Sequence, residues 1–399
     1  AALIVYREFE IPGDPPTFVG KSCFVLRGEW EAVASRILDP RKTCRKKFRL
    51  SSTLKSCKRI FDVECRFCDK KAAAAARCKW ERAVSGPSPG HSSLIRGTPS
   101  LLRRRVRELT EGWARGIAEN REGGGGKHGL ANSYVPDQQG CFETPRMFGG
   151  TLATSPEEYS SHNNLLRVGV AKTKGKFRVV TMQPAYVKRT LTSLHNTLYD
   201  FLTEHAWCVR GDVTRETFQS VVDDVRPGES YISGDYSSAS DGIYPWATAV
   251  MVDALLEEEG LTDEERTVLR ESFTNLQWVS KCGKKHPIIR GQMMGSLVGF
   301  PLLCLLNKAC FDIATDIQFG SGTRRVGRFN GDDCCFAGSD SFFGLWREVT
   351  STFGLTVNEE KTGISKFFIE LNSNIFDVRK GSLISKPVLS FLRPRRDSP

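Results

Sequence analysis

The sequence lacks both a hydrophobic run long enough to cross a membrane and an N-terminal leader. Its longest apolar stretch lies between Arg290 and Lys308 and has 17 residues, among them Gly, Gln, Ser and Pro, whereas a spanning helix needs about 20 apolar residues. The first ten residues, AALIVYREFE, lack the basic N-terminal region of a signal peptide and already contain charged side chains. No signal peptide is therefore predicted. An internal repeat is also absent. We therefore expect a soluble protein.

Nor does the cysteine content predict a disulfide scaffold. The 13 cysteines are an odd number, and 399 residues can build a buried core without covalent cross-links. Hydrophobic residues make up 40% and charged residues 26%, close to globular averages, which excludes whole-chain disorder and a collagen-like repeat. These values indicate two or three domains in a reducing compartment. The chain starts without Met and stops on RPRRDSP, which is consistent with a fragment.

Charge divides unevenly along the chain, whose formal net charge is +11. Residues 1–200 hold 35 Lys/Arg and 19 Asp/Glu, net +16, and residues 201–399 hold 22 and 27, net −5. A basic half joined to a mildly acidic half predicts a bound polyanion and acidic chemistry. Residues 41–60 carry nine basic side chains and no acid. We favour RNA-backbone contacts for them; a flexible tail and a targeting signal are the alternatives.

Apolar spacing and turn residues predict mixed helical and strand structure in residues 100–366. The expected elements are a helix from residue 100 that ends before the glycines at 123–126, a strand in SYISGDY, helices over 245–259 and 263–277, an apolar helix in PLLCLLNKACFDIATDI, a hairpin in VGRFNGDDCCFAG, and a helix over 341–353.

Two acidic segments stand at predicted strand ends. Asp332 and Asp333 follow Asn-Gly at the turn of the hairpin, where they could also be a solvated turn. Asp235 closes the apolar strand, where it could also be a helix N-cap, and Asp241 follows six positions later. If the two strand ends lie side by side, their carboxylates form a cluster that is costly without a cation and suits a pair of hard divalent metals.

An ordered series of motifs links these acids to the rest of the chain. It runs Gly-Asp-x5-Asp, Gly-x-Met-Met-Gly-Ser…Phe-Pro-Leu-Leu…Asn, Asn-Gly-Asp-Asp and Gly-Leu-x-x-Asn-x-x-Lys-Thr. Over roughly residues 166–376 this series resembles the palm motifs of viral RNA-dependent RNA polymerases. The x5 spacing and MMGSLVGFPLLCLLNKA are most similar to the ourmia-like viruses (the botourmiavirus group), which are related to narnavirus and RNA phage replicases.

The resemblance implies an α+β right-hand polymerase fold, in which fingers and thumb frame an antiparallel palm sheet flanked by helices. It also implies an RNA-directed RNA polymerase that replicates a positive-strand viral RNA genome. The matching domain ranges are a basic N-terminal region associated with the fingers over 1–99, fingers over 100–229, palm over 230–366 with a fingers segment near 260–290, and a primer-grip hairpin with the start of an incomplete thumb over 367–399.

The resemblance assigns the catalytic metals to Asp235 and Asp332, with Asp333 as a further contributor. Two Mg²⁺ ions, with Mn²⁺ as a substitute, would activate the primer 3′-OH and hold the triphosphate. Lys361 matches a lysine proposed to protonate the leaving pyrophosphate. The implied partners are template and nascent RNA and NTPs, and the implied location is the host cell cytoplasm, with the mitochondrion as an alternative.

Four further positions match contacts to nucleotide or RNA. Asp241 and Asn307 match the pair that senses the ribose 2′-OH, although Asn307 could also be a polar residue facing solvent. Gly295 and Ser296 match a turn that lets the backbone approach the template and the incoming nucleotide. Gly299 replaces the Ser or Thr common in related sequences, so no ribose contact is assigned there.

Two flanking segments complete the resemblance. In AKTKGKFRVVT, basic residues alternate along an expected strand, which places them on one face suited to a triphosphate, although a solvated strand edge is the alternative. Lys174, Lys176 and Arg178, after Lys172, are the predicted NTP contacts. Residues 367–375 resemble the primer-grip hairpin, and Phe368 is the predicted primer contact.

Three rival functions were weighed. A reverse transcriptase would be expected to have a bulky aromatic at the position of Asp241 and an aromatic in the metal turn. A non-catalytic RNA-binding or capsid protein would explain the basic half but not the ordered Asp, Asn and Lys pattern. A two-metal nuclease would explain the carboxylates alone.

The cysteines at 57–78 raise the question of zinc. Cys65 and Cys68 form one CxxC pair with Cys57 and Cys78 nearby, but the Cys57-x7-Cys65 spacing is irregular and a second pair is missing. We therefore expect ordinary reduced cysteines here.

Overall fold

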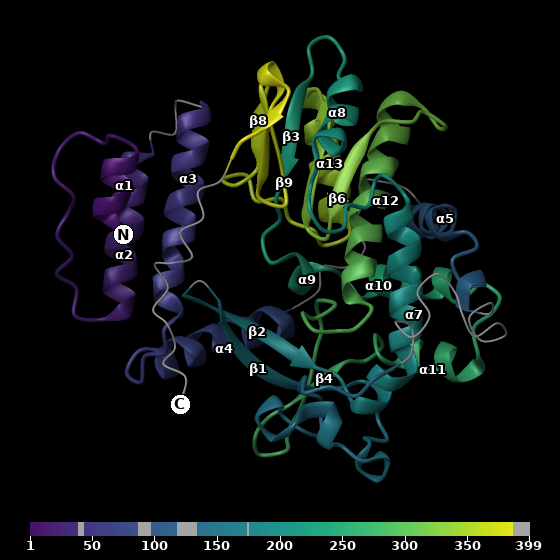
Figure 1. The fold of residues 1–399 in the computed structure, drawn as a ribbon. Coiled ribbons are helices and arrows are strands. Elements are labelled where there is room, and N and C mark those ends of the chain that lie inside the picture. Colours follow the sequence, from purple (N-terminus) through teal and green to yellow (C-terminus); the bar gives the residue numbers. More distant parts are fainter. Residues whose placement is uncertain (39–43, 87–96, 118–133, 174, 386–399) are drawn as a thin grey trace. The chain divides into compact units, whose positions relative to one another are not determined.

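The computed structural model describes residues 1–38, 44–86, 97–117, 134–173 and 175–385, and the chain forms two compact units (Figure 1). Unit 1 comprises Ala1–Trp80, Val170–Val179 and Asn374–Pro399. Unit 2 comprises Glu81–Gly169 and Val180–Ser373. Because unit 1 is assembled from three separate segments, neither unit coincides with one continuous range. The division into fingers, palm and thumb stays a prediction.

Three helices form the core of unit 1: α1 (Ala2–Glu8), α2 (Cys23–Ile37) and α3 (Arg45–Cys57). In α3 the buried apolar side chains recur at helical spacing, which turns one face of a strongly basic helix inward. They pack with residues of α1 and α2 in a small cluster made of Val5, Phe9, Trp30, Leu50, Leu54 and Cys57. After α3 come η1 (Lys58–Asp62) and α4 (Asp69–Ser85), and the C-terminal part of the unit contains β10 (Asn374–Asp377), η6 (Val378–Lys380) and β11 (Ser382–Leu383).

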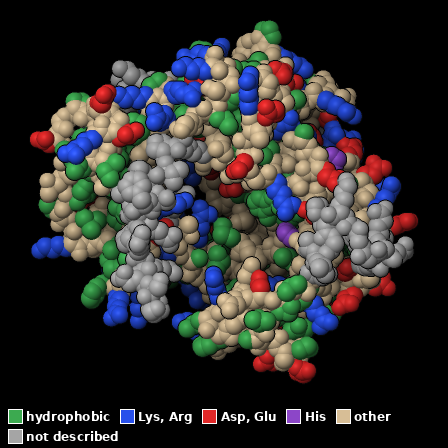
Figure 2. Space-filling model, viewed as in Figure 1, with side chains coloured by type: hydrophobic (Ala, Val, Ile, Leu, Met, Phe, Trp, Pro, Cys, Tyr) green, Lys and Arg blue, Asp and Glu red, His purple; other side chains and the backbone are tan. Residues whose placement is uncertain are grey.

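The basic side chains of residues 41–60 are partly engaged inside unit 1. Arg45 donates to the hydroxyl of Ser382 at 3.1 Å, and Lys46 pairs with Glu10 at 3.8 Å. On the face shown in Figure 2, acidic side chains likewise lie among basic ones. Exposed pairs of this kind contribute little stability and exchange readily with other anions. The predicted RNA-backbone contact of this stretch stays a prediction.

The basic segment AKTKGKFRVVT is a hairpin and not one strand, which corrects the sequence-based expectation. β1 (Leu165–Thr173) ends before Gly175, and β2 (Lys176–Met182) starts after it. Gly175 has a φ of +69°, a left-handed conformation that glycine adopts without strain. Its N–H donates to the Asp62 carboxylate at 2.8 Å, and its carbonyl accepts from Arg27 at 2.6 Å. The turn therefore lies in unit 1, while both strands continue into unit 2.

A four-stranded antiparallel sheet is the centre of unit 2. Its order is β6-β7-β3-β8, built from β3 (Ser230–Gly234), β6 (Gly327–Asn330), β7 (Asp333–Gly338) and β8 (Gly363–Ser365). β9 (Phe368–Leu371) contacts all four strands. The predicted strand and hairpin are thus confirmed, as is the α+β fold with an antiparallel sheet.

Helices pack on this sheet through aromatic side chains. α12 (Gly299–Phe319) and α13 (Asp340–Thr352) pack against each other and contact β6 and β7, respectively (Figure 1). The ring of Phe336 in β7 lies 5.1 Å from Phe311 of α12 and 5.1 Å from Trp346 of α13, measured between centroids. Large buried aromatic pairs of this kind supply much of the apolar area that stabilises a core.

The remaining helices of unit 2 extend this core. They are α5 (Thr98–Thr110), α7 (Ala185–Glu204), α8 (Arg215–Asp223), α9 (Ala239–Gly242), α10 (Pro245–Leu255) and α11 (Asp263–Glu271), with short turns η3 (Arg146–Phe148), η4 (Gly150–Ala153) and η5 (Pro156–Glu158). The helices predicted over 245–259 and 263–277 are shorter than expected. α11 stops early because Asn275 has a φ of +49° and Gln277 already starts a strand.

A second sheet has the order β2-β1-β4-β5. β4 (Gln277–Val279) pairs in parallel with the start of β1 and antiparallel with β5 (Lys285–Pro287). Throughout both units, none of the helices described combines the length and hydropathy needed to cross a bilayer.

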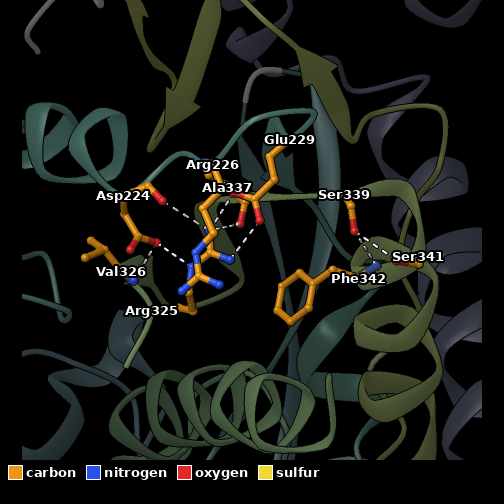
Figure 3. A network of polar contacts seen from close by, with 9 residues as sticks. All are labelled: Asp224, Arg226, Glu229, Arg325, Val326, Ala337, Ser339, Ser341 and Phe342. Atoms are coloured by element: carbon orange, nitrogen blue, oxygen red, sulfur yellow. Dashed lines mark hydrogen bonds and ion pairs between the residues drawn. The ribbon is translucent and has the colours of Figure 1, made fainter. Parts of the chain in front are cut away.

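Arg325 forms a buried polar network at the edge of the first sheet (Figure 3). The Arg325 side chain is 1% exposed. Its guanidinium donates to both carboxylate oxygens of Glu229, at 2.8 and 2.7 Å, and to Asp224 at 2.8 Å. A longer contact of 3.3 Å reaches the carbonyl of Ala337. The network therefore connects β7 with three other segments of unit 2. These are the end of α8, the segment before β3 and the segment before β6.

Replacing Arg325 by methionine is expected to lower the free energy of unfolding by about 3–5 kcal/mol, because it leaves two carboxylates partly buried without their partner. Burial alone would raise the pKa of Glu229, but the Arg325 hydrogen bonds and charge lower it below its usual value. In the wild type this contribution is present above the usual pKa of a glutamate and is lost as the pH falls through the lowered pKa. Urea unfolding at pH 7 and at pH 3 measures both effects, and an R325M protein as stable as wild type at pH 7 would contradict them.

Candidate active site

Strand register brings the predicted acids together at one end of the sheet. Gly234 and Cys334 form the last pair between β3 and β7. Asp235 follows this pair on β3 and Asp333 precedes it on β7, so the two acids lie opposite each other. Asn330 pairs with Asp333 across the hairpin, which places Asp332 in the turn beside them. The expectation that two strand ends place their carboxylates side by side is therefore met in the structure.

The electrostatics of this cluster indicate a cation site. The pKa of Asp333 is raised to about 7, first by burial and then by the negative charges of Asp332, Asp235 and Glu370. Like charges held this close destabilise one another unless a positive ion lies between them. The donor set consists of carboxylate oxygens, which hard divalent cations prefer. Asp235, Asp332 and Asp333 therefore offer the kind of donor atoms that a divalent metal prefers.

Lys361 lies at the same cluster, as the resemblance implied. Its Nζ is 3.4 Å from Asp235 Oδ2, and its side chain is 58% exposed. The segment that carries it is fixed to the strand end: the N–H of Asn358 donates to the carbonyl of Asp235 at 2.8 Å, and the N–H of Asp235 donates to Thr362 at 3.3 Å. The ammonium group is thus held beside the carboxylates while it stays accessible to solvent.

Asp333→Asn is expected to stabilise the protein in EDTA. The folded wild type keeps a proton on Asp333 up to about pH 7, so between pH 4 and 7 it binds more protons than the unfolded chain and its free energy of unfolding falls as the pH rises. The amide carries no charge, so above pH 7 the variant should be more stable by about 1–3 kcal/mol. Urea unfolding in EDTA at pH 5 and pH 8 measures this difference. Asp212→Asn, at an exposed aspartate of the same unit, serves as the matched control. An equal fall in the free energy of unfolding from pH 5 to pH 8 in both variants would refute the explanation.

Asn307 lies on α12 and makes hydrogen bonds inside the protein. Its side chain is fully buried; its Oδ1 accepts from the Tyr236 hydroxyl at 2.8 Å and its Nδ2 donates to the carbonyl of Gly331 at 3.0 Å. Tyr236 follows Asp235, and Gly331 precedes Asp332. The amide therefore joins the two acidic segments to α12, and the ribose contact predicted for Asn307 stays a prediction.

Asp241 lies in the short helix α9 beside the loop that leads to α12. A side chain added at Gly291 would come within 3.0 Å of the Asp241 Cα, and the N–H of Gln292 donates to the carbonyl of Ser240 at 2.8 Å. Gln292 was not singled out from the sequence, where a glutamine in a glycine-rich loop gives no signal. It is 1% exposed, and both polar atoms of its carboxamide lack a hydrogen-bond partner in the described part of the chain.

Gly295 and Ser296 make internal contacts in this loop. A Cβ at Gly295 would lie 2.1 Å from the carbonyl oxygen of Thr181, so the glycine is needed where the loop crosses β2. Ser296 is 7% exposed and donates to the carbonyl of Gln292 at 3.0 Å. Their predicted contacts to template and NTP stay predictions.

The predicted primer contact, Phe368, is buried in β9 with 4% of its surface exposed, whereas Phe367 is 47% exposed. Phe367 lies in the bend directly before β9 and not in the strand itself. Phe367 is therefore the ring of this pair that a nucleic acid could reach.

The predicted NTP contacts belong to unit 1, while the acids belong to unit 2. Lys176 and Arg178 are exposed on β2, two positions apart and hence on one face. Lys174 lies outside the described residues. Lys172 is on β1, where its ammonium contacts the Asp69 carboxylate at 2.9 Å.

Comparison with known proteins agrees with this arrangement. The chain is 23% identical over 333 residues to the RNA-dependent RNA polymerase of Ourmia melon virus (isolate Melon/Iran/VE9), a match that covers 66% of the chain and 38% of that protein. The chain therefore spans well under two thirds of the length of this relative. No family model matches the chain.

Solved structures give the fold. The RNA-dependent RNA polymerase of a human picobirnavirus superimposes with a TM-score of 0.58 at 16% identity, covering 93% of this chain and 76% of the polymerase. An insertion-loop deletion mutant of the same enzyme gives 0.59 at 15% identity, covering 94% and 76%. With its carboxylates at the strand ends of an antiparallel sheet, this chain has the fold of the viral RNA-dependent RNA polymerases and is similar in sequence to one of them.

Proposed function

We propose that the protein is a viral RNA-directed RNA polymerase that replicates a positive-strand RNA genome from NTPs. The observation that carries the proposal is the grouping of Asp235, Asp332 and Asp333 at one sheet edge, with the Lys361 ammonium 3.4 Å from Asp235. The proposed partners are template RNA, nascent RNA and NTPs, and the proposed location is the host cell cytoplasm, with the mitochondrion as the alternative.

Asp235, Asp332 and Asp333 would hold two Mg²⁺ ions, for which Mn²⁺ could substitute. When bound, such ions activate the primer 3′-OH and neutralise the triphosphate. Lys361 would donate a proton to an oxygen of the leaving pyrophosphate; its ammonium lies 3.4 Å from Asp235, and its side chain is exposed to solvent. Lys176 and Arg178 would attract the triphosphate through their positive charge.

Asp241 and Gln292 are the proposed ribose-sensing pair. The Asp241 carboxylate would accept a hydrogen bond from the 2′-OH, and the buried, unpartnered carboxamide of Gln292 would supply the amide that the family resemblance placed at Asn307. A deoxyribose would leave the buried carboxamide of Gln292 without this hydrogen bond, which lowers its relative rate of incorporation.

The test of the proposed function is RNA synthesis by the purified chain. An RNA template, Mg²⁺ and labelled NTPs should give template-length product. RNA binding without synthesis under these conditions would instead favour a non-catalytic RNA-binding protein, and comparable incorporation of dNTPs would favour a reverse transcriptase.

The ribose assignment has its own test in paired variants. Gln292→Ala should reduce discrimination between an NTP and its dNTP by about 3–10-fold, the value of one hydrogen bond. Asn307→Ala is the matched comparison, because it removes an equally buried amide that holds the acidic segments. It should lower the melting temperature and leave discrimination unchanged. If discrimination falls with Asn307→Ala and not with Gln292→Ala, the assignment to Gln292 is wrong.

A further inference from the structure

Three cysteines of unit 1 lie together although 42 positions separate the first two in sequence. The sulfur atoms of Cys23, Cys65 and Cys68 are all within 4.8 Å of one another, and each side chain is partly buried. In a tetrahedral site with Zn–S bonds of about 2.3 Å, the sulfurs stand about 3.8 Å apart. The cluster is therefore compact enough for a single zinc ion.

The backbone between Cys65 and Cys68 folds around the first sulfur. The N–H groups of Cys68 and Phe67 donate to the sulfur of Cys65. The carbonyl of Cys65 in turn accepts from the N–H of Asp69 at 3.0 Å. A CxxC turn closed by N–H donors to sulfur prepares a thiolate for a metal, because these bonds offset part of its charge.

The other two cysteines stand at helix N-termini. Cys23 is the first residue of α2, whose N-cap Ser22 accepts from the N–H of Val25 at 3.2 Å. Cys68 directly precedes the first residue of α4. Both sulfurs are therefore carried by the backbone at the start of a helix, and the cluster brings these two helix starts together.

We propose that Cys23, Cys65 and Cys68 bind a zinc ion through three thiolates, with water at the fourth position. Soft thiolate ligands suit zinc, and each thiol releases its proton as the metal binds. This revises the expectation of ordinary reduced cysteines and the ligand set considered with it. Cys57 is buried in the α1–α3 core, and Cys78 is exposed on α4.

The proposed site supports the basic hairpin of the same unit. The Asp69 carboxylate accepts from the N–H of Cys65 at 3.0 Å and from the Lys172 ammonium at 2.9 Å, so one side chain joins the cysteine turn to β1. Lys172 also donates to the carbonyl of Val63 at 2.6 Å, just before the turn. Partners of this kind orient the first ligands of a metal site. Zinc would thus fix α2, α4 and the hairpin with one ion.

The test is the metal content of the full chain purified under reducing conditions. One zinc per chain is expected by elemental analysis, and Co²⁺ exchanged for it should give thiolate-to-metal charge-transfer absorption. Cys23→Ser and Cys68→Ser should each lose the zinc and the cobalt absorption, whereas Cys78→Ser, the matched exposed cysteine on α4, should keep both. Far-UV circular dichroism shows whether each variant is folded.

Three results would overturn the proposal. They are a folded wild-type chain without zinc that takes up no Co²⁺, a disulfide between any two of the three cysteines in that chain by mass spectrometry, and zinc retained by Cys23→Ser but lost by Cys78→Ser. Because these readouts concern metal content and thiol state, they are independent of polymerase activity.

Discussion

Asp332→Asn is expected to abolish RNA synthesis while leaving the fold intact. The substitution removes one negative charge from the turn between β6 and β7, where Asp235 and Asp333 lie beside it. If two divalent ions neutralise the charge that develops on the triphosphate, losing a carboxylate ligand removes several kcal/mol of transition-state stabilisation, and the rate should fall by about 10³-fold or more.

The fold should survive because the amide has nearly the same shape and its neutrality relieves the repulsion that raises the pKa of Asp333. Primer extension on an RNA template measures the loss, and filter binding of that RNA should be unchanged. Asp212→Asn, with an exposed carboxylate in unit 2, should retain full activity. An Asp332→Asn protein that still extends primers at a tenth of the wild-type rate would contradict the assignment of Asp332 as a metal ligand.

Gly295→Ala is expected to cause a large loss of stability in unit 2. The residue has a φ of +112°, and an added Cβ would lie 2.1 Å from the Thr181 carbonyl oxygen. The loop cannot easily move away from β2, because two hydrogen bonds hold it there. Thr181 donates to the carbonyl of Met294 through its N–H, at 2.7 Å, and through its hydroxyl, at 3.0 Å. Backbone strain and overpacking together should lower the free energy of unfolding by roughly 2–5 kcal/mol.

Gly211→Ala separates these two effects. Gly211 has a similar left-handed φ of +77° but has nothing within 4 Å of an added Cβ, so only the strain of about 1 kcal/mol applies. Urea unfolding of both variants measures the difference, and Gly295→Ala should also reduce RNA synthesis, since the loop that carries Gln292 must shift. Equal losses of stability in the two variants would show that the contact with Thr181 does not constrain the loop.

Local sequence patterns were sufficient for the sheet and its acids. An apolar strand that ends in Asp235, and β-favouring residues on both sides of Asn-Gly-Asp-Asp, predicted the two elements that the structure pairs. The reason is that alternation and turn chemistry act over a few neighbouring residues, and a buried sheet face then allows only one register. The resemblance to viral polymerases drew on the same residues and led to the fold that the solved structures share.

Helix ends and the basic hairpin were harder to predict from the sequence, because single residues determine them. Gly175 divides AKTKGKFRVVT into two strands, and its turn is held by contacts to Asp62 and Arg27, more than a hundred positions away in sequence. The alternation of basic residues is compatible with one strand as well as with two, so only tertiary contacts could distinguish them.

By itself, the sequence determined which residue types carry the chemistry: acids at strand ends, a lysine downstream and a basic segment upstream. The tertiary structure decided which polar side chains form hydrogen bonds inside the protein. Asn307 is hydrogen-bonded to Tyr236 and Gly331, while Gln292 is buried with no hydrogen-bond partner among the residues that the structure describes. The tertiary structure also brought the sulfur of Cys23 close to those of Cys65 and Cys68. Hydrogen-bond partners and metal ligands are chosen by distance in space, which sequence spacing reveals only within a single turn or strand.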